Sequence, residues 1–166
     1  MIRAAALLTL LAAPAAAQVA ACQGALPFDD TVAALEEEGW TVHRAADPLP
    51  DAAVERLAWA LAATYLGGDR GGETTEAIVA LQRRSVPGLA RKRDTDTTRS
   101  RTLLRGDGAL ILTDTQTGPG RVERSCRIAT DAPVPPGPGV SAVDGAAFDG
   151  APRGLAETRV AVDTLR

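Results

Sequence analysis

His43 is the only histidine of this 166-residue chain and its first candidate for acid–base chemistry. A histidine works as a general base when a nucleophile lies within hydrogen-bond reach and a third group orients the ring. None of the four serines lies in a nucleophile-elbow motif, and the best match, around Ser141, lacks the second glycine. We therefore expect His43 on an exposed strand, with a small secreted hydrolase that pairs His43 with a carboxylate as the alternative.

A basic segment offers a second kind of chemistry, the binding of anions. Residues 83–127 contain eleven basic and five acidic residues, whereas residues 18–82 contain three basic and eleven acidic ones. Guanidinium groups bind phosphate, carboxylate and acidic polymers through charge-assisted hydrogen bonds. The predicted anion-binding residues are Arg83, Arg84, Arg91, Lys92, Arg93, Arg99 and Arg101. The alternative is a solvated loop and strand edge that pairs internally with the acidic half of the chain.

Three further motifs match functional patterns only in part. Residues 67–72 are glycine-rich, but they lack the Lys-Ser/Thr ending of a phosphate-binding loop. Asp94 and Asp96 alternate as calcium ligands do, without the glycine and closing glutamate of such a loop. Residues 105–107 spell the Arg-Gly-Asp tripeptide that integrins recognise, and these residues also suit a hairpin turn. One histidine and two cysteines exclude multi-histidine and four-cysteine metal sites, so we expect no metal and no cofactor.

The N-terminal residues predict export. Residues 1–17 combine a basic start at Arg3, an apolar run and three alanines before Gln18, which is the pattern of a cleaved signal peptide. The apolar run is shorter than the roughly 20 residues of a membrane-spanning helix. We therefore expect a periplasmic or secreted protein with no transmembrane span.

Cys22 and Cys126 are the only cysteines. Because export would place them in an oxidising compartment, we predict a disulfide between them. Residues 19–22 (VAAC) also resemble a lipobox, in which the cysteine is acylated. A lipoprotein anchored through Cys22 is therefore the alternative to the disulfide.

Periodicity and turn residues predict the elements that would position these groups. Helices are expected after Asp29, over 52–66 and over 73–84, followed by a turn at Pro87-Gly88. A strand is expected over 40–44, a β-meander over 102–129 and a last strand over 158–165. On the third meander strand, Cys126 and Arg124 share the inward face with Val122 and Ile128.

The expected organisation is one domain with a small core. Residues 18–130 form its α+β part, 131–154 a loop with five prolines and five glycines, and 155–166 a strand that returns to the sheet. The predicted fold is α+β, a small antiparallel sheet of about four to five strands with two to three helices packed on one face.

The function expected from these features is that of an exported, non-enzymatic binding or envelope-accessory module. Its partner would be an anionic envelope component or another periplasmic protein. Nucleic acid is an unsuitable partner, because the chain is acidic overall and has no aromatic residue between Tyr65 and Phe148 to stack on bases.

Overall fold

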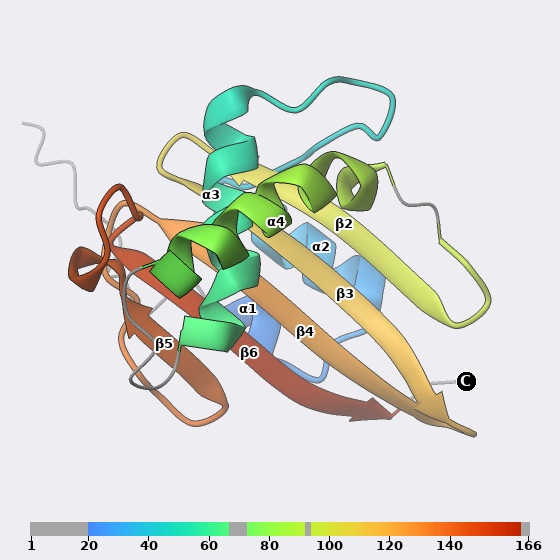
Figure 1. The fold of residues 1–166 in the computed structure, drawn as a ribbon. Helices are drawn as coiled ribbons and strands as arrows, with labels where there is room; N and C mark the ends of the chain where they lie inside the picture. The colour runs from blue at the N-terminus through green and yellow to red at the C-terminus, as the bar shows by residue number, and fades with distance from the viewer. Residues whose placement is uncertain (1–19, 67–72, 92–93, 164–166) are drawn as a thin grey trace, which may run out of the picture.

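The computed structural model describes residues 20–66, 73–91 and 94–163, which form a six-stranded antiparallel sheet and four α-helices (Figure 1). The predicted signal peptide, the glycine-rich segment 67–72, and Lys92 and Arg93 lie outside these ranges. The helices are α1 (Ala20–Gln23), α2 (Phe28–Glu37), α3 (Asp51–Leu66) and α4 (Glu73–Ala90). The strands are β1 (Thr41–Val42), β2 (Thr98–Arg105), β3 (Gly108–Gly118), β4 (Arg121–Thr130), β5 (Val140–Asp144) and β6 (Gly154–Asp163).

The sheet has the strand order β1-β2-β3-β4-β6-β5, and every neighbouring pair is antiparallel. The predicted meander is confirmed, because β2, β3 and β4 follow one another through tight turns at residues 106–107 and 119–120. The predicted last strand is confirmed as β6, which returns beside β4. Strand β4 therefore lies inside the sheet, where both of its edges are hydrogen-bonded.

Helices cover both faces of the sheet, which corrects the expectation that they pack on one face. In Figure 1, α3 and α4 lie in front of the sheet and α1 and α2 lie behind it. Ile111 packs in the core on the α3 side, whereas Leu110 and Leu112 pack in a second core with Leu35 of α2. A strand buried on both faces is a continuous apolar run, as residues 109–112 (ALIL) are, and such a run gives no alternation from which to count layers.

Helix α4 is longer than predicted. It was expected to end at Arg84 before a turn at Pro87-Gly88, and it continues to Ala90 with Pro87 inside it. Proline removes one backbone hydrogen bond near the end of a helix. The neighbouring Val86 is fully buried in the core on the α3 side, and this packing offsets the loss.

The segment 131–154 contains regular structure that its composition did not predict. Strand β5 pairs with β6 from Val140 to Asp144, and a 3₁₀ turn follows over Gly145–Ala147. A Cβ atom on Gly145 would lie 1.7 Å from the carbonyl oxygen of Pro152. This glycine therefore permits close backbone packing, and its presence here does not mark a loose loop.

The predicted disulfide is confirmed. Cys22 of α1 is bonded to Cys126 of β4 across a sequence separation of 104 residues, and both side chains are fully buried. Cys126 lies on the α2 side of the sheet, and the alternation of β4 had predicted its inward position. The bond holds the N-terminal helix against an interior strand.

Candidate functional site

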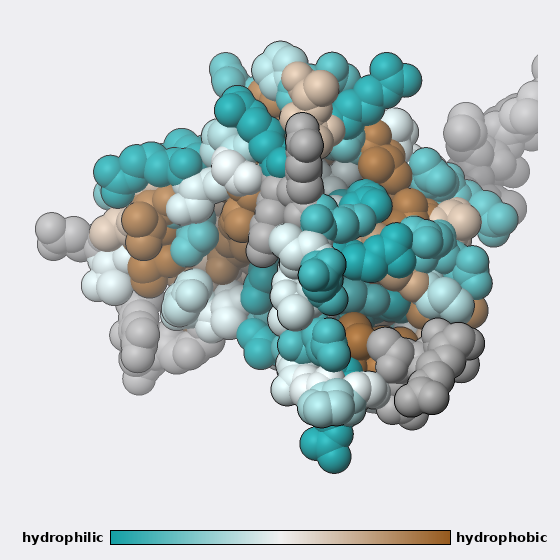
Figure 2. Space-filling view, turned by 90° about the vertical axis from the view of Figure 1, so that its right-hand side faces the viewer, coloured by the Kyte–Doolittle hydropathy of each residue, from teal (hydrophilic) through white to brown (hydrophobic). Residues whose placement is uncertain are grey.

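A pocket of about 360 Å³ lies on the α2 side of the sheet, where the start of α2 meets the ends of four strands. Pro27, Phe28, Val122 and Val162 give it apolar walls. Polar groups come from the segment that enters β2, which includes Thr97 and Arg99, and from Gln116, Asp114 and Arg124 on the neighbouring strands. Figure 2 views this end of the molecule and shows apolar surface in brown between hydrophilic side chains in teal.

The buried guanidinium of Arg124 supports one wall of the pocket. Its Nε and Nη2 atoms donate to the two carboxylate oxygens of Asp114, each over 2.8 Å. Its Nη1 atom donates to the carbonyl oxygen of Leu26 and to Oγ1 of Thr31, over 2.7 and 2.6 Å. Arg124 is 0% exposed, so these contacts are what compensates the desolvation of its charge. Arg124 thereby fastens the segment that leads into α2 onto the sheet.

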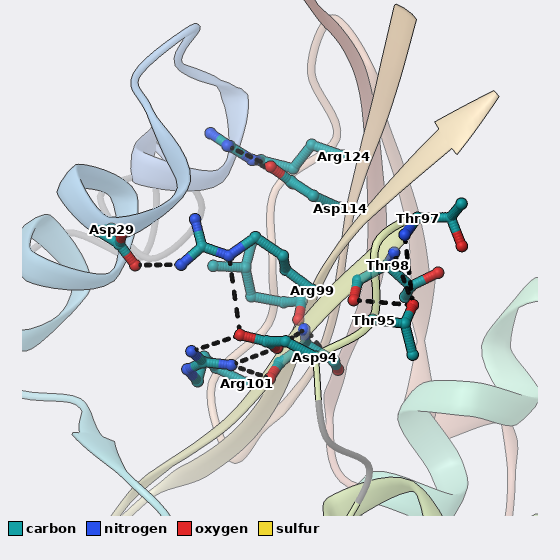
Figure 3. A network of polar contacts seen from close by, with 11 residues as sticks. Asp29, Asp94, Thr95, Thr97, Thr98, Arg99, Arg101, Asp114 and Arg124 are labelled. Carbon is teal, nitrogen blue, oxygen red and sulfur yellow. Dashed lines mark hydrogen bonds and ion pairs between the residues drawn. The ribbon is translucent and has the colours of Figure 1, made fainter. Parts of the chain in front are cut away.

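A second bidentate pair, between Asp94 and Arg101, lies beside the lining residue Arg99 (Figure 3). The hydrogen bonds from Arg101 lower the pKa of Asp94, and the Ser100 backbone N–H and the Arg99 guanidinium act in the same direction. Asp94 also accepts a hydrogen bond of 3.2 Å from the backbone N–H of Ser100, a residue of β2. Both carboxylate oxygens of Asp94 therefore accept hydrogen bonds from nitrogen donors.

Arg99 is the cation at the pocket that keeps an open donor. Its guanidinium carbon lies 4.4 Å from the centroid of the Phe28 ring, a cation–π contact that fixes its position. Its Nη2 atom donates to Asp29 over 2.6 Å and its Nε atom lies 3.8 Å from Asp94. In Figure 3, dashed lines leave two of its three nitrogens, and Nη1 has no hydrogen bond within the described part of the chain.

The remaining predicted anion-binding residues are dispersed. Arg83 of α4 pairs with Glu55 of α3 over 2.6 Å, on the opposite side of the sheet from Arg99. This hydrogen bond lowers the pKa of Glu55. Arg84 is exposed within α4, and Arg91 is exposed just after its last residue. Of the predicted residues that the structure describes, which exclude Lys92 and Arg93, only Arg99 and Arg101 lie together, and Arg83 and Arg99 pair with the acidic half of the chain.

The other motifs are engaged in local contacts. His43 Nε2 lies 3.2 Å from the backbone carbonyl oxygen of Asp47, and no carboxylate or hydroxyl bonds to this ring among the residues described. Arg105 and Asp107 of the Arg-Gly-Asp tripeptide pair with each other, and Arg105 also lies over the ring of Trp40. Hydrogen bonding from Arg105 lowers the pKa of Asp107.

The described residues offer neither a metal-binding cluster nor a membrane-spanning helix. Within 20–66, 73–91 and 94–163, no three histidine, cysteine, aspartate or glutamate side chains are placed to hold a metal ion. No helix in these same ranges combines the length and the apolar content needed to cross a bilayer.

Sequence reasoning did not single out Asp114, Arg124 or Phe28 as site residues. A signal for Arg124 was present, because the alternation of β4 placed this arginine on the face that also carries Cys126. An arginine on an inward face needs a buried partner, and the pair then forms a buried polar site.

Comparison of the chain with protein-family models, with curated proteins and with solved structures finds no match.

Proposed function

We propose that this protein is an exported, non-enzymatic binding module that holds a small ligand in the pocket beside α2. One observation carries the proposal: apolar walls at Phe28 and Val122 adjoin a cation, Arg99, that keeps a hydrogen-bond donor free. Pockets for small molecules combine mainly apolar linings with a few oriented polar groups. A volume of about 360 Å³ suits a ligand of modest size.

The disulfide supports the exported setting. Disulfides persist in oxidising compartments and are rare where thiols are kept reduced. The Cys22 sulfur is bonded to Cys126, and a sulfur in a disulfide cannot carry a thioether-linked lipid. This pairing favours a cleaved signal peptide over a lipid anchor at Cys22.

The contacts of His43 favour binding over catalysis. The ring contact of His43 is with a backbone carbonyl, and no carboxylate of the described residues orients the ring as a general base. The pocket lies beside α2 and the ends of β2, β3, β4 and β6, and His43 is not among its lining residues.

The test is to fill the pocket and follow binding by two-dimensional ¹H–¹⁵N NMR. Octan-1-ol and 1-anilinonaphthalene-8-sulfonate serve as uncharged and anionic probes. The expected result is saturable shifts at the amides of Phe28 and Val122, which the substitution Val122→Trp abolishes. Val140→Trp is the matched control, because Val140 is also half-buried and does not line this pocket. Shifts that are absent, or that persist in Val122→Trp, would refute the proposal.

A further inference from the structure

The class of ligand follows from which charges at the pocket are already paired; this inference rests on the function proposed above. Asp114 lines the pocket and Asp94 lies beside its lining, and each is held by both arms of a guanidinium, from Arg124 and Arg101. Asp96 also lines the pocket; it is exposed to water and has no ion pair among the described residues. Such bidentate pairs neutralise themselves and present little charge to a third group. Arg99 is different, because it has one short hydrogen bond, to Asp29, and an unused Nη1 atom.

The contact between Arg99 and Asp29 is open to exchange. The Asp29 side chain is 74% exposed and that of Arg99 is 40% exposed, whereas Arg124 is fully buried. Exposed ion pairs of this kind are weak, because water screens the charges and the side chains lose freedom on pairing. A carboxylate from a ligand can therefore bind Nη1 and replace Asp29 at Nη2, which makes the bidentate arrangement that Arg99 lacks.

The position of Arg99 directs such a carboxylate to the mouth of an apolar pocket. Stacking on Phe28 holds the guanidinium in place, so little freedom is lost when a ligand binds. Behind this pair lie Pro27, Val122 and Val162, which have no charge to offer and suit a hydrocarbon chain. The first turn of α2 carries Asp29 and Asp30, which already complement the positive end of the helix dipole, so the attraction for a carboxylate comes from Arg99.

We propose that the pocket binds a small aliphatic carboxylate, with its carboxylate on Arg99 and its hydrocarbon chain against Pro27, Phe28, Val122 and Val162. In this arrangement Asp29 competes with the ligand for Arg99. The free protein thus carries its own weak substitute for the ligand's carboxylate, and a ligand binds by displacing it.

The test compares three probes of equal chain length: octanoate, octan-1-ol and octylamine, titrated at pH 7 and followed by amide shifts of Phe28 and Val122. Octanoate is expected to bind the tightest. Arg99→Gln should weaken octanoate binding by roughly tenfold and leave octan-1-ol unchanged, because only the carboxylate uses the guanidinium. Arg99→Lys, which keeps the charge, should restore part of the loss.

Asp29→Asn supplies the sharpest result, because the expected effect is a gain. Removing the internal competitor should strengthen octanoate binding by roughly two- to fivefold, as expected for the loss of a weak exposed ion pair. Glu37→Gln is the net-charge control for Asp29→Asn, and Arg84→Gln is that for Arg99→Gln, since Glu37 and Arg84 are exposed and do not line the pocket. Circular dichroism checks that each variant folds.

The possible failures are distinct. Equal binding of octan-1-ol and octanoate would overturn the ligand class and leave the binding function standing. Tighter binding of octylamine, weakened by Asp29→Asn, would replace a carboxylate pocket with a cation pocket. If no probe shifts the amides of Phe28 and Val122, the binding function itself fails.

Discussion

Arg124 and Asp114 lie directly opposite each other on β4 and β3, and two parallel hydrogen bonds of 2.8 Å join them beneath the start of α2. Both side chains are buried, and the third nitrogen of Arg124 reaches Leu26 and Thr31 on the covering segment. The pair therefore joins two strands and the segment above them in one polar contact, and the wall of the pocket depends on it.

Removing one partner of this pair should cost far more stability than removing both. Arg124→Met leaves the Asp114 carboxylate buried and unpaired, which should lower the free energy of unfolding by about 3–5 kcal/mol. The double variant Arg124→Met/Asp114→Leu should recover a large part of this loss, because it leaves no uncompensated charge. Urea unfolding followed by circular dichroism measures the wild type, the single variants Arg124→Met and Asp114→Leu, and the double variant.

The matched control for that series is Arg121→Met, on the same strand but exposed, and it should change stability by less than about 0.5 kcal/mol. If the double variant loses the sum of the two single losses, the two side chains do not act as a pair.

Breaking the disulfide should weaken the fold without changing its topology. Cys22→Ala/Cys126→Ala opens a loop whose ends are 104 residues apart, and the expected loss in the free energy of unfolding is about 2–4 kcal/mol. The measurement is urea unfolding with and without reductant. With reductant, the free energy of unfolding of the wild-type protein should approach that of the double variant. Reductant should not change the free energy of unfolding of the double variant itself. A reductant effect on the variant would contradict the assignment.

Glu38 should make the fold more stable at acidic than at neutral pH, relative to a neutral replacement. Burial raises the pKa of Glu38 above its ordinary value of 4.5, although Arg105 partly offsets the effect. Below pH 4.5 the side chain is protonated in both states and imposes no penalty. As the pH rises through 4.5 toward the higher folded pKa, the unfolded state releases its proton first, and the fold loses stability.

Glu38→Gln should therefore raise the midpoint of thermal unfolding at pH 7 by about 1–3 °C and have a smaller effect at pH 4. The Oε2 atom of Glu38 has no hydrogen-bond partner within the described chain, so the replacement breaks no hydrogen bond of that atom. Glu37→Gln, at the exposed last residue of α2 next to Glu38, is the control. A midpoint difference that is the same at pH 7 and pH 4 would show that ionisation of Glu38 is not the cause.

Two glycines should respond to alanine in opposite directions. Gly145→Ala places a Cβ atom against the Pro152 carbonyl and should cost about 1–3 kcal/mol, because the backbone must move. Gly88→Ala meets no atom within 4 Å inside α4 and should stabilise the protein by about 0.5–1 kcal/mol. Thermal unfolding of both variants measures this, and a stable Gly145→Ala protein would show that the packing beside Pro152 is loose.

Local patterns predicted the individual elements better than their layers. The turns at residues 106–107 and 119–120 and the inward position of Cys126 were readable because each depends on neighbours in the chain. The position of helices on both faces depends on how the apolar run 109–112 is covered from each side. Strand β5 was missed because its pairing with β6 outweighs a composition rich in proline and glycine.

The candidate site was only partly readable for a related reason. Arg99 and Arg101 were singled out by their charge, but their role depends on partners that fold against them. Asp29 is 70 residues from Arg99 in the chain, and nothing in the sequence links them. The basic residues also lie on different elements: Arg83 is on α4, which covers one face of the sheet, and Arg99 of β2 packs on Phe28 at the other face. A cluster of basic residues in the sequence is therefore not a cluster in space.

The disulfide also turns most of the chain into a closed covalent ring. Because it joins Cys22 to Cys126, a protease that cuts one peptide bond anywhere between these residues releases no fragment. The two pieces would migrate as a single band on a gel without reductant and separate when reductant is added. The pocket draws its residues from segments inside and outside this ring, so a nicked molecule would keep both halves of the site attached.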